Sequence, residues 1–208
     1  WVVDIMVSAL AWDQADDDLI VDVGAGAGRF AFAAAQTLPA AKVIAMERDA
    51  LLAETVRGTI KSARLGHRVS VLPADFLRVD WPAPPGRTIF LGNPPYVRHH
   101  SILPEDKAWL REAGRQLGTP LSGLSGLHVY FMVRCFLRAR AGDRLMMILP
   151  SEWLETAYGV AIKAAILARC TKTTLYLFPP QTSLFGATMT TSVILDLHFG
   201  RPTGAVYE

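Results

Sequence analysis

The chain has 208 residues, of which 51% are hydrophobic and 19% charged, so it can bury one large core. A formal net charge of +2 is too small to indicate a partner by itself. Two distant cysteines, Cys135 and Cys170, have no ligand spacing, which argues against a zinc site or a disulfide scaffold and for a reducing compartment. We expect no metal site.

No apolar run approaches the ~20 residues that a membrane span requires, and no signal-peptide pattern is visible. The chain begins at Trp1, inside an amphipathic pattern, so we expect a piece of a longer protein.

Short apolar runs alternate with helical patterns, which predicts βαβ units and a mostly parallel sheet. The first four strands are expected at 19–23, 42–46, 68–72 and 87–91, with helices after the first two. The stretch 98–126 contains several loop signals, and a helix is expected from Leu127 onward, ending near Gly142. A fifth strand at 144–149 leads to Ser151, which is placed to cap a further helix.

Two more strands are expected at 172–178 and 190–197. The 11 residues between them (179–189) are too few for a crossover helix, so this pair should be antiparallel. The predicted fold class is therefore α/β, doubly wound, with seven strands and the last one reversed. In such sheets ligands bind beyond the carboxyl ends of the strands.

A glycine loop joins the first strand to the first long helix in VDVGAGAGRF (21–30), through Gly24, Gly26 and Gly28. Glycines there let a ligand approach the backbone, close to a helix N-terminus. The G-x-G-x-G spacing differs from the G-x-G-x-x-G dinucleotide fingerprint and favours a ligand without a pyrophosphate.

Two acids follow at the next strand ends. Glu47 lies 25 residues after Asp22 (47 − 22) and can accept hydrogen bonds from ribose hydroxyls. Asp75 follows the third strand, where it can accept from an adenine amino group while Phe76 supplies an apolar wall. Glu47 alone fits a helix start about equally well, and Asp75 alone would more often be a turn or N-cap residue. The hypothesis of a nucleoside ligand depends on the order of these features. The glycine loop, Glu47 and Asp75 follow the ends of three consecutive strands.

The fourth strand runs into FLGNPPYVRHH (90–100), where two prolines stop any regular element. The Asn93 side-chain oxygen and the Pro94 carbonyl can accept hydrogen bonds from an aromatic amine and release its delocalised lone pair. Pro94 and Pro95 would hold these acceptors in place. Tyr96 can stack on the ring that carries the amine. A stiff structural turn is the alternative.

Together, VDVGAGAGRF, Glu47, Asp75, GNPPY and LPSEWL resemble the class I S-adenosylmethionine-dependent methyltransferases. More narrowly, they resemble the gamma-class N6-adenine DNA methyltransferases of bacterial restriction–modification systems. The resemblance covers nearly the whole chain and implies a three-layer αβα Rossmann-like catalytic domain over residues 1–208. It implies transfer of a methyl group from S-adenosylmethionine to the N6 amine of a flipped adenine in DNA.

The resemblance also implies which residues form the site. Those that hold the cofactor would be Asp22, Gly24, Gly26, Glu47, Asp75, Phe76 and Asn93. Those that act on the amine would be Asn93, Pro94, Pro95 and Tyr96. LFGATMTTSVILDL (184–197) resembles the family's late motif, in which Phe185 would stack on the adenine opposite Tyr96. In a loop before a strand, core packing is an equally common use of such an aromatic residue.

By the same resemblance, reading of the DNA sequence falls to a target recognition domain or a specificity subunit outside this chain, and the protein belongs in the bacterial cytoplasm. Three alternatives remain open at this point. The same chemistry can act on ribosomal RNA bases or on a protein glutamine amide. A non-catalytic nucleotide-binding subunit and a dinucleotide oxidoreductase are the others.

Overall fold

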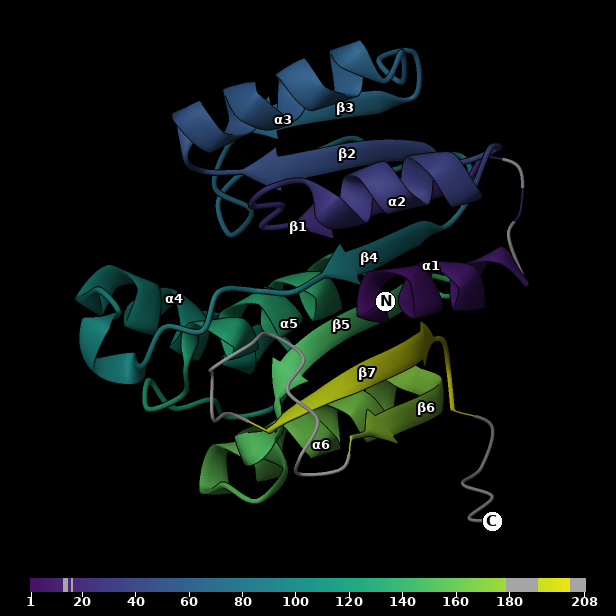
Figure 1. The fold of residues 1–208 in the computed structure, drawn as a ribbon. Coiled ribbons are helices and arrows are strands. Elements are labelled where there is room, and N and C mark those ends of the chain that lie inside the picture. Colours follow the sequence, from purple (N-terminus) through teal and green to yellow (C-terminus); the bar gives the residue numbers. More distant parts are fainter. Residues whose placement is uncertain (13–14, 16, 179–190, 203–208) are drawn as a thin grey trace. The chain divides into compact units, whose positions relative to one another are not determined.

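The computed structural model describes residues 1–12, 15, 17–178 and 191–202, which divide into two compact units, Trp1–Asn93 and Pro94–Glu208 (Figure 1). Among the described residues, no helix is long and apolar enough to cross a membrane.

The first unit holds four parallel strands in the order β3-β2-β1-β4. Its elements are α1 (Val2–Ala11), β1 (Leu19–Val23), α2 (Arg29–Thr37), β2 (Lys42–Glu47), α3 (Ala50–Ser62), β3 (Val69–Pro73) and β4 (Thr88–Gly92). Strands β1 (LIVDV) and β4 (TIFLG) are buried along their whole length, and apart from Asp22 and Thr88 their residues are apolar or glycine, as is typical of central parallel strands. Strand register pairs Val23 with Met46 and Glu47 with Pro73, so the carboxyl ends lie at one edge.

Helices cover this sheet through small and β-branched residues. Helix α2 buries Phe30 and three alanines, and α3 buries Ala53, Val56 and Ile60. Figure 1 shows α3 along β3, which it contacts. The Asp49 side chain caps α3 by accepting from the backbone N–H groups of Leu51 and Leu52. These helix starts fix the positions of the loops that follow β1 and β2.

In the second unit, three strands in the order β5-β7-β6 form an antiparallel sheet. Its elements are η1 (His99–Ser101), α4 (Pro104–Gln116), α5 (Leu127–Arg138), β5 (Arg144–Pro150), η2 (Ser151–Leu154), α6 (Ala157–Arg169), β6 (Cys170–Leu177) and β7 (Ser192–Phe199). Arg144 of β5 forms a buried bidentate ion pair with Asp196 of β7, with N–O distances of 2.8 and 2.7 Å. Strand register places Pro150 opposite Ser192.

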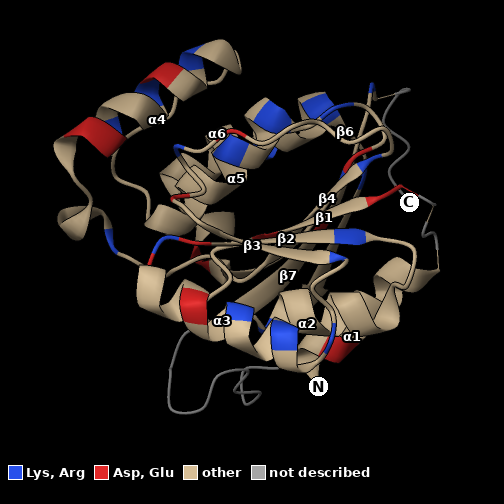
Figure 2. Cartoon of the chain, turned by 90° about the horizontal axis from the view of Figure 1, so that it is seen from above, with Lys and Arg blue, Asp and Glu red and all other residues tan. Residues whose placement is uncertain are grey.

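The expected fold class is confirmed. All seven predicted strands are present in the described residues, and the last one runs antiparallel to its neighbours. Helix α4 lies within the stretch 98–126, where the sequence showed loop signals and no helix was predicted, and both acidic and basic positions occur along it (Figure 2). The expectation that Ser151 caps a helix is wrong, because Ser151 begins the short η2 and its hydroxyl contacts Thr191.

Candidate functional site

The glycine loop follows β1 at the carboxyl edge of the first unit. Gly24, Gly26 and Gly28 all have positive φ values, of 70°, 55° and 75°. At Gly28 a β-carbon would lie 2.7 Å from Val56 Cγ1, so this glycine permits α2 to pack on α3. At Gly26 a β-carbon would meet no atom within 4 Å. Gly28 therefore serves packing, whereas Gly26 leaves open space for a ligand.

The Glu47 carboxylate binds this loop directly. One oxygen accepts from the Gly26 N–H at 2.8 Å, and the other accepts from the Asp49 N–H at 2.9 Å. Because the Gly26 N–H already donates to the Glu47 carboxylate, the loop repels a phosphate group and favours a ligand with positive charge. The carboxylate still has free acceptor capacity, and its predicted hydrogen bonds to ribose hydroxyls stay a prediction.

Asp22 adds a second acid beside the loop. It is 1% exposed, and one carboxylate oxygen accepts from the Ala31 N–H at 2.9 Å. The other oxygen is buried and has no hydrogen-bond partner among the described residues. Burial raises the pKa of Asp22 to about 7; the Ala31 N–H lowers it and the nearby Glu47 charge raises it further. A cationic ligand close to this pair would stabilise the charged carboxylate.

Asp75 and Phe76 follow β3 at the same edge. The Asp75 carboxylate accepts from the Leu77 N–H at 2.9 Å and lies 3.6 Å from Arg78 Nε. Phe76 is 2% exposed, and its ring stacks on Trp81 with centroids 5.5 Å apart. Phe76 therefore belongs to the core of the first unit. The expected contacts of both residues with an adenine remain predictions.

Asn93 directly follows the last residue of β4. Gly92 has φ 152°, and a β-carbon there would lie 3.1 Å from the Val23 carbonyl oxygen and 3.3 Å from Asp22 Oδ1. Only glycine lets the ends of β1 and β4 approach this closely. Asn93 Oδ1 is buried and has no hydrogen-bond donor among the described residues. Such an orphaned acceptor is what an amine substrate would satisfy.

Tyr96 lies in the second unit and is 38% exposed. Its hydroxyl forms a hydrogen bond with the Ser192 side chain, and partial burial raises the pKa of the phenol to about 12, so it stays neutral. Its ring is nearly perpendicular to that of His128, at 78° and 6.4 Å between centroids. His128 is 2% exposed, and burial lowers its pKa to about 4.

A cavity of about 410 Å³ lies beside Tyr96, entirely within the second unit. This volume lies in the range of roughly 300–1,000 Å³ that is typical of small-molecule sites. The cavity is lined by Tyr96, Val97, Arg98, His99, Leu124, Gly126, His128, Pro150, Glu152 and Tyr158. The Tyr158 hydroxyl donates to the Glu152 carboxylate at 3.3 Å. Polar groups and an aromatic wall thus meet in one concave site.

The sequence predicted Tyr96 but not the other polar residues around it, which are His128, Glu152, Tyr158 and Ser192. LPSEWL indicated family likeness without assigning a use to Glu152, and no motif assigned a use to His128. One signal was available, since Gly126 lies two residues before His128 and a β-carbon there would lie 2.9 Å from the imidazole. Phe185 lies outside the described residues.

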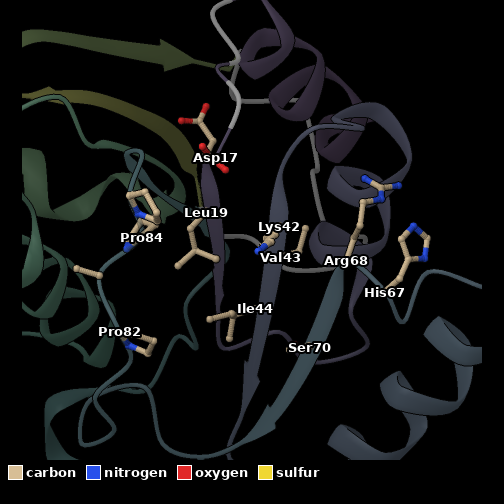
Figure 3. Close-up of a pocket in the computed structure, with 13 residues that line it drawn as sticks. Asp17, Leu19, Lys42, Val43, Ile44, His67, Arg68, Ser70, Pro82 and Pro84 are labelled. Carbon is tan, nitrogen blue, oxygen red and sulfur yellow. The ribbon is translucent and has the colours of Figure 1, made fainter.

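A second cavity, of about 480 Å³, lies at the amino ends of β1 and β2 (Figure 3). No predicted site residue lines it. Two of its charged residues already serve the fold, because Asp18 binds Arg87 at 3.0 Å and Arg68 donates to the Leu38 carbonyl at 3.1 Å. In the part of the chain that the structure describes, no cluster of acids, histidines and cysteines is suited to a metal ion.

Comparison with known proteins places these sites in context. Residues 86–185 match the family described as Eco57I restriction-modification methylase. The type II methyltransferase M.XamI of Xanthomonas campestris pv. amaranthicola is 36% identical over 198 residues, which are 94% of this chain and 38% of the relative. M.AccI of Acinetobacter calcoaceticus is 26% identical over 127 residues, or 61% of this chain and 23% of the relative. The chain therefore spans well under half the length of these curated relatives.

Solved structures support the fold. A class I S-adenosylmethionine-dependent methyltransferase from Listeria monocytogenes superposes with a TM-score of 0.74 at 14% identity, covering 99% of this chain and 61% of that one. TYW2 of M. jannaschii, solved with AdoMet, gives 0.57 at 14% identity, covering 95% and 76%. The Rossmann-like methyltransferase fold is thus confirmed. The family match and the identity to M.XamI confirm the resemblance to restriction–modification methyltransferases that the motifs indicated.

Proposed function

Because the chain resembles the restriction–modification methyltransferases, we propose that it transfers a methyl group from S-adenosylmethionine to the N6 amine of adenine in DNA. One observation carries the proposal. Asn93 presents a buried side-chain oxygen without a donor, in the described part of the chain, at the start of Asn93-Pro94-Pro95-Tyr96. An exocyclic amine can donate the hydrogen bond that this oxygen lacks.

The glycine loop suits the cofactor. S-adenosylmethionine supplies, when bound, an electrophilic methyl group on a sulfonium, and it carries no phosphate. The Glu47 carboxylate, bound to the Gly26 N–H, creates a negative local potential that matches a cation and opposes a dinucleotide. A bound cation would also favour the charged form of Asp22, whose pKa burial raises to about 7. Glu47 and Asp75 would bind the ribose and the adenine of the nucleoside. Gly24, Gly26, Phe76 and Asn93 complete the predicted set.

The amine is activated by hydrogen bonding. Asn93 Oδ1 and the Pro94 carbonyl oxygen accept hydrogen bonds from the two N–H groups of the substrate amine. These hydrogen bonds draw the nitrogen toward tetrahedral geometry and free its lone pair. The freed lone pair would accept the methyl group that S-adenosylmethionine would supply, and the electrons of the broken carbon–sulfur bond would stay on sulfur. The methylated amine then releases a proton to water. Tyr96 and the rigid Pro94-Pro95 pair hold the base during the transfer.

The target base would occupy the cavity beside Tyr96. Flipping a base out of the duplex costs a few kcal/mol of free energy, and stacking of the base on aromatic side chains offsets this cost. Phe185 is proposed as the second stacking residue. We also propose that residues 1–208 are the catalytic domain, that DNA sequence is read by a target recognition domain or a specificity subunit outside this chain, and that the protein acts in the bacterial cytoplasm.

The proposal is tested by methyl transfer from tritiated S-adenosylmethionine to unmethylated genomic DNA. We expect Asn93→Ala and Tyr96→Ala to lower kcat by about 10²-fold or more, while the Kd of the cofactor changes little for Tyr96→Ala. Tyr176→Ala, at a tyrosine of similar exposure on β6, is the matched control. Unchanged activity of the full-length protein in both site variants would favour a non-catalytic nucleotide-binding subunit, with the methyl transfer carried out elsewhere in a larger assembly. Label found only in RNA or protein would reject the DNA substrate.

A further inference from the structure

Two side chains that the sequence did not single out hold Tyr96. The imidazole of His128 lies nearly perpendicular to the Tyr96 ring, and the Ser192 side chain hydrogen-bonds its hydroxyl. All three residues belong to the second unit. The role of these two side chains rests on the proposed function, in which the Tyr96 ring stacks on the target base.

His128 is held where it is by the start of α5. It is the second residue of the helix, and Gly126 before the helix has no side chain to collide with the imidazole, whose Cε1 and Nδ1 would each lie 2.9 Å from a β-carbon. The Leu127 N–H donates to the Val97 carbonyl at 2.9 Å. The residue after Tyr96 is therefore tied to the residue before His128. His128 Nε2 is buried without a hydrogen-bond partner in the described ranges.

Ser192 is held by the sheet. It is the first residue of β7, nine-tenths buried, and lies opposite Pro150, which lines the cavity. The preceding residue, Thr191, accepts from the Ser151 N–H at 2.9 Å. The hydroxyl that meets Tyr96 is therefore fixed by strand pairing rather than by a loop alone.

We propose that His128 and Ser192 are positioning residues that fix the tilt and the rotation of the Tyr96 ring against the base in the cavity. A tyrosine side chain turns about two bonds. The perpendicular imidazole restricts the tilt of the ring, and the hydrogen bond to Ser192 restricts its swing. Preorganising a stacking surface removes an ordering cost from the methyl transfer step.

Charge supports this assignment. With a pKa of about 4, the imidazole is neutral at physiological pH. A neutral ring behind Tyr96 does not oppose the positive charge that develops on the amine during transfer. A protonated histidine at this position would oppose it.

The link between Tyr96 and Ser192 is tested with a double-mutant cycle in the full-length protein. Tyr96→Phe and Ser192→Ala remove the same hydrogen bond, so each should lower kcat about fivefold, and the double variant should lower it no further. The KM for S-adenosylmethionine should stay unchanged. Ser125→Ala removes a buried hydroxyl without a partner in the described residues and should leave kcat at the wild-type value. A double variant slowed about 25-fold, the product of two independent effects, or an unchanged Ser192→Ala kcat, overturns this link.

His128 is tested by separating ring shape from nitrogen chemistry. His128→Ala should lower kcat about tenfold at an unchanged KM for the cofactor, whereas His128→Phe should keep kcat within about twofold of wild type. Melting temperatures of both variants report on folding. Equal losses in the two variants, or no loss in His128→Ala, overturn the positioning claim.

Failure of the positioning role can be told apart from failure of the proposed function. If Asn93→Ala and Tyr96→Ala keep their methyl transfer rate, the proposed function fails. If both lose it while Ser192→Ala and His128→Ala do not, only the positioning of Tyr96 is wrong.

Discussion

Asn93 and Glu47 differ in how far their local sequence specifies their chemistry. The N-P-P-Y turn predicts where Asn93 lies and what its oxygen offers, and the structure leaves that oxygen without a donor in the described residues. Glu47 was placed correctly at the end of β2. Its hydrogen bond to Gly26 joins positions 21 residues apart, and spacing alone does not predict such a contact. His128 was missed because its place beside Tyr96 depends on how α5 begins.

Asp22 gives a prediction about pH. Its pKa is raised from 3.8 to about 7, so between these values the folded protein binds more protons than the unfolded chain. This contribution to stability is present below pH 4 and is lost as pH rises through 7. At pH 8 the buried carboxylate costs on the order of 4 kcal/mol. We expect Asp22→Asn to remove this part of the pH dependence in urea unfolding at pH 5 and pH 8.

The control for Asp22→Asn is Glu155→Gln, at an exposed acid between η2 and α6. We expect the control to leave the stability difference between the two pH values unchanged. If Asp22→Asn also leaves it unchanged, the pH dependence does not arise from this buried carboxylate.

The elements themselves were predicted well where apolar patterns were strong. Strands β1 and β4 are mainly apolar, so their existence followed from sequence, whereas the burial of Asp22 in β1 did not. Helix α4 was missed because it buries only Leu110, Ala113 and Gly114, which is too thin a stripe to reveal a helical period. Pro104 at its start and two acids in its first turn were the available signals.

At the end of β4, we expect Gly92→Ala to destabilise the protein by about 1–3 kcal/mol, because φ 152° and the contact with the Val23 carbonyl oxygen both oppose a β-carbon. Gly58→Ala is the control, since it lies in α3 with no atom within 4 Å of the new carbon. That change should stabilise by about 0.5–1 kcal/mol. Urea midpoints measure both, and an unaffected Gly92→Ala would disprove the close approach of β1 and β4.

The ion pair between β5 and β7 predicts a second element-scale effect. Asp196→Ala leaves the Arg144 guanidinium buried without its bidentate partner, which should cost about 3–5 kcal/mol of unfolding free energy. Replacing both residues, as Arg144→Met with Asp196→Leu, should recover most of that loss. Equal losses in the single and double variants would mean that strand packing, rather than an unpaired charge, sets the cost.

For the whole molecule, the alternation of strand and helix patterns specified the fold class, and solved structures confirmed it. The cavity beside Tyr96 was beyond sequence reasoning. Its lining comes from the segment after β4, the start of α5, the end of β5 with η2, and Tyr158 of α6, and only packing shows that their side chains face one space. The site was thus predictable where one motif carries it, and not where several separate segments build it.

Cofactor choice is a property of the whole molecule. At 100 times its Kd, S-adenosylmethionine should stabilise the folded state by about 2.7 kcal/mol and raise Tm by roughly 5–10 °C. NAD should leave Tm unchanged, because Glu47 already occupies the loop donor that a phosphate would need. Differential scanning fluorimetry with each ligand measures this. A shift with NAD alone would point to a dinucleotide enzyme instead.

The central claim is tested most directly by methylation-sensitive sequencing of DNA from cells that express either the intact protein or its Asn93→Ala variant. We predict N6-methyladenine at one defined sequence in DNA from cells with the intact protein. The same site should be unmodified in DNA from cells with the variant. DNA without methyladenine in both, with the methyl label recovered only from RNA or protein, would contradict the account.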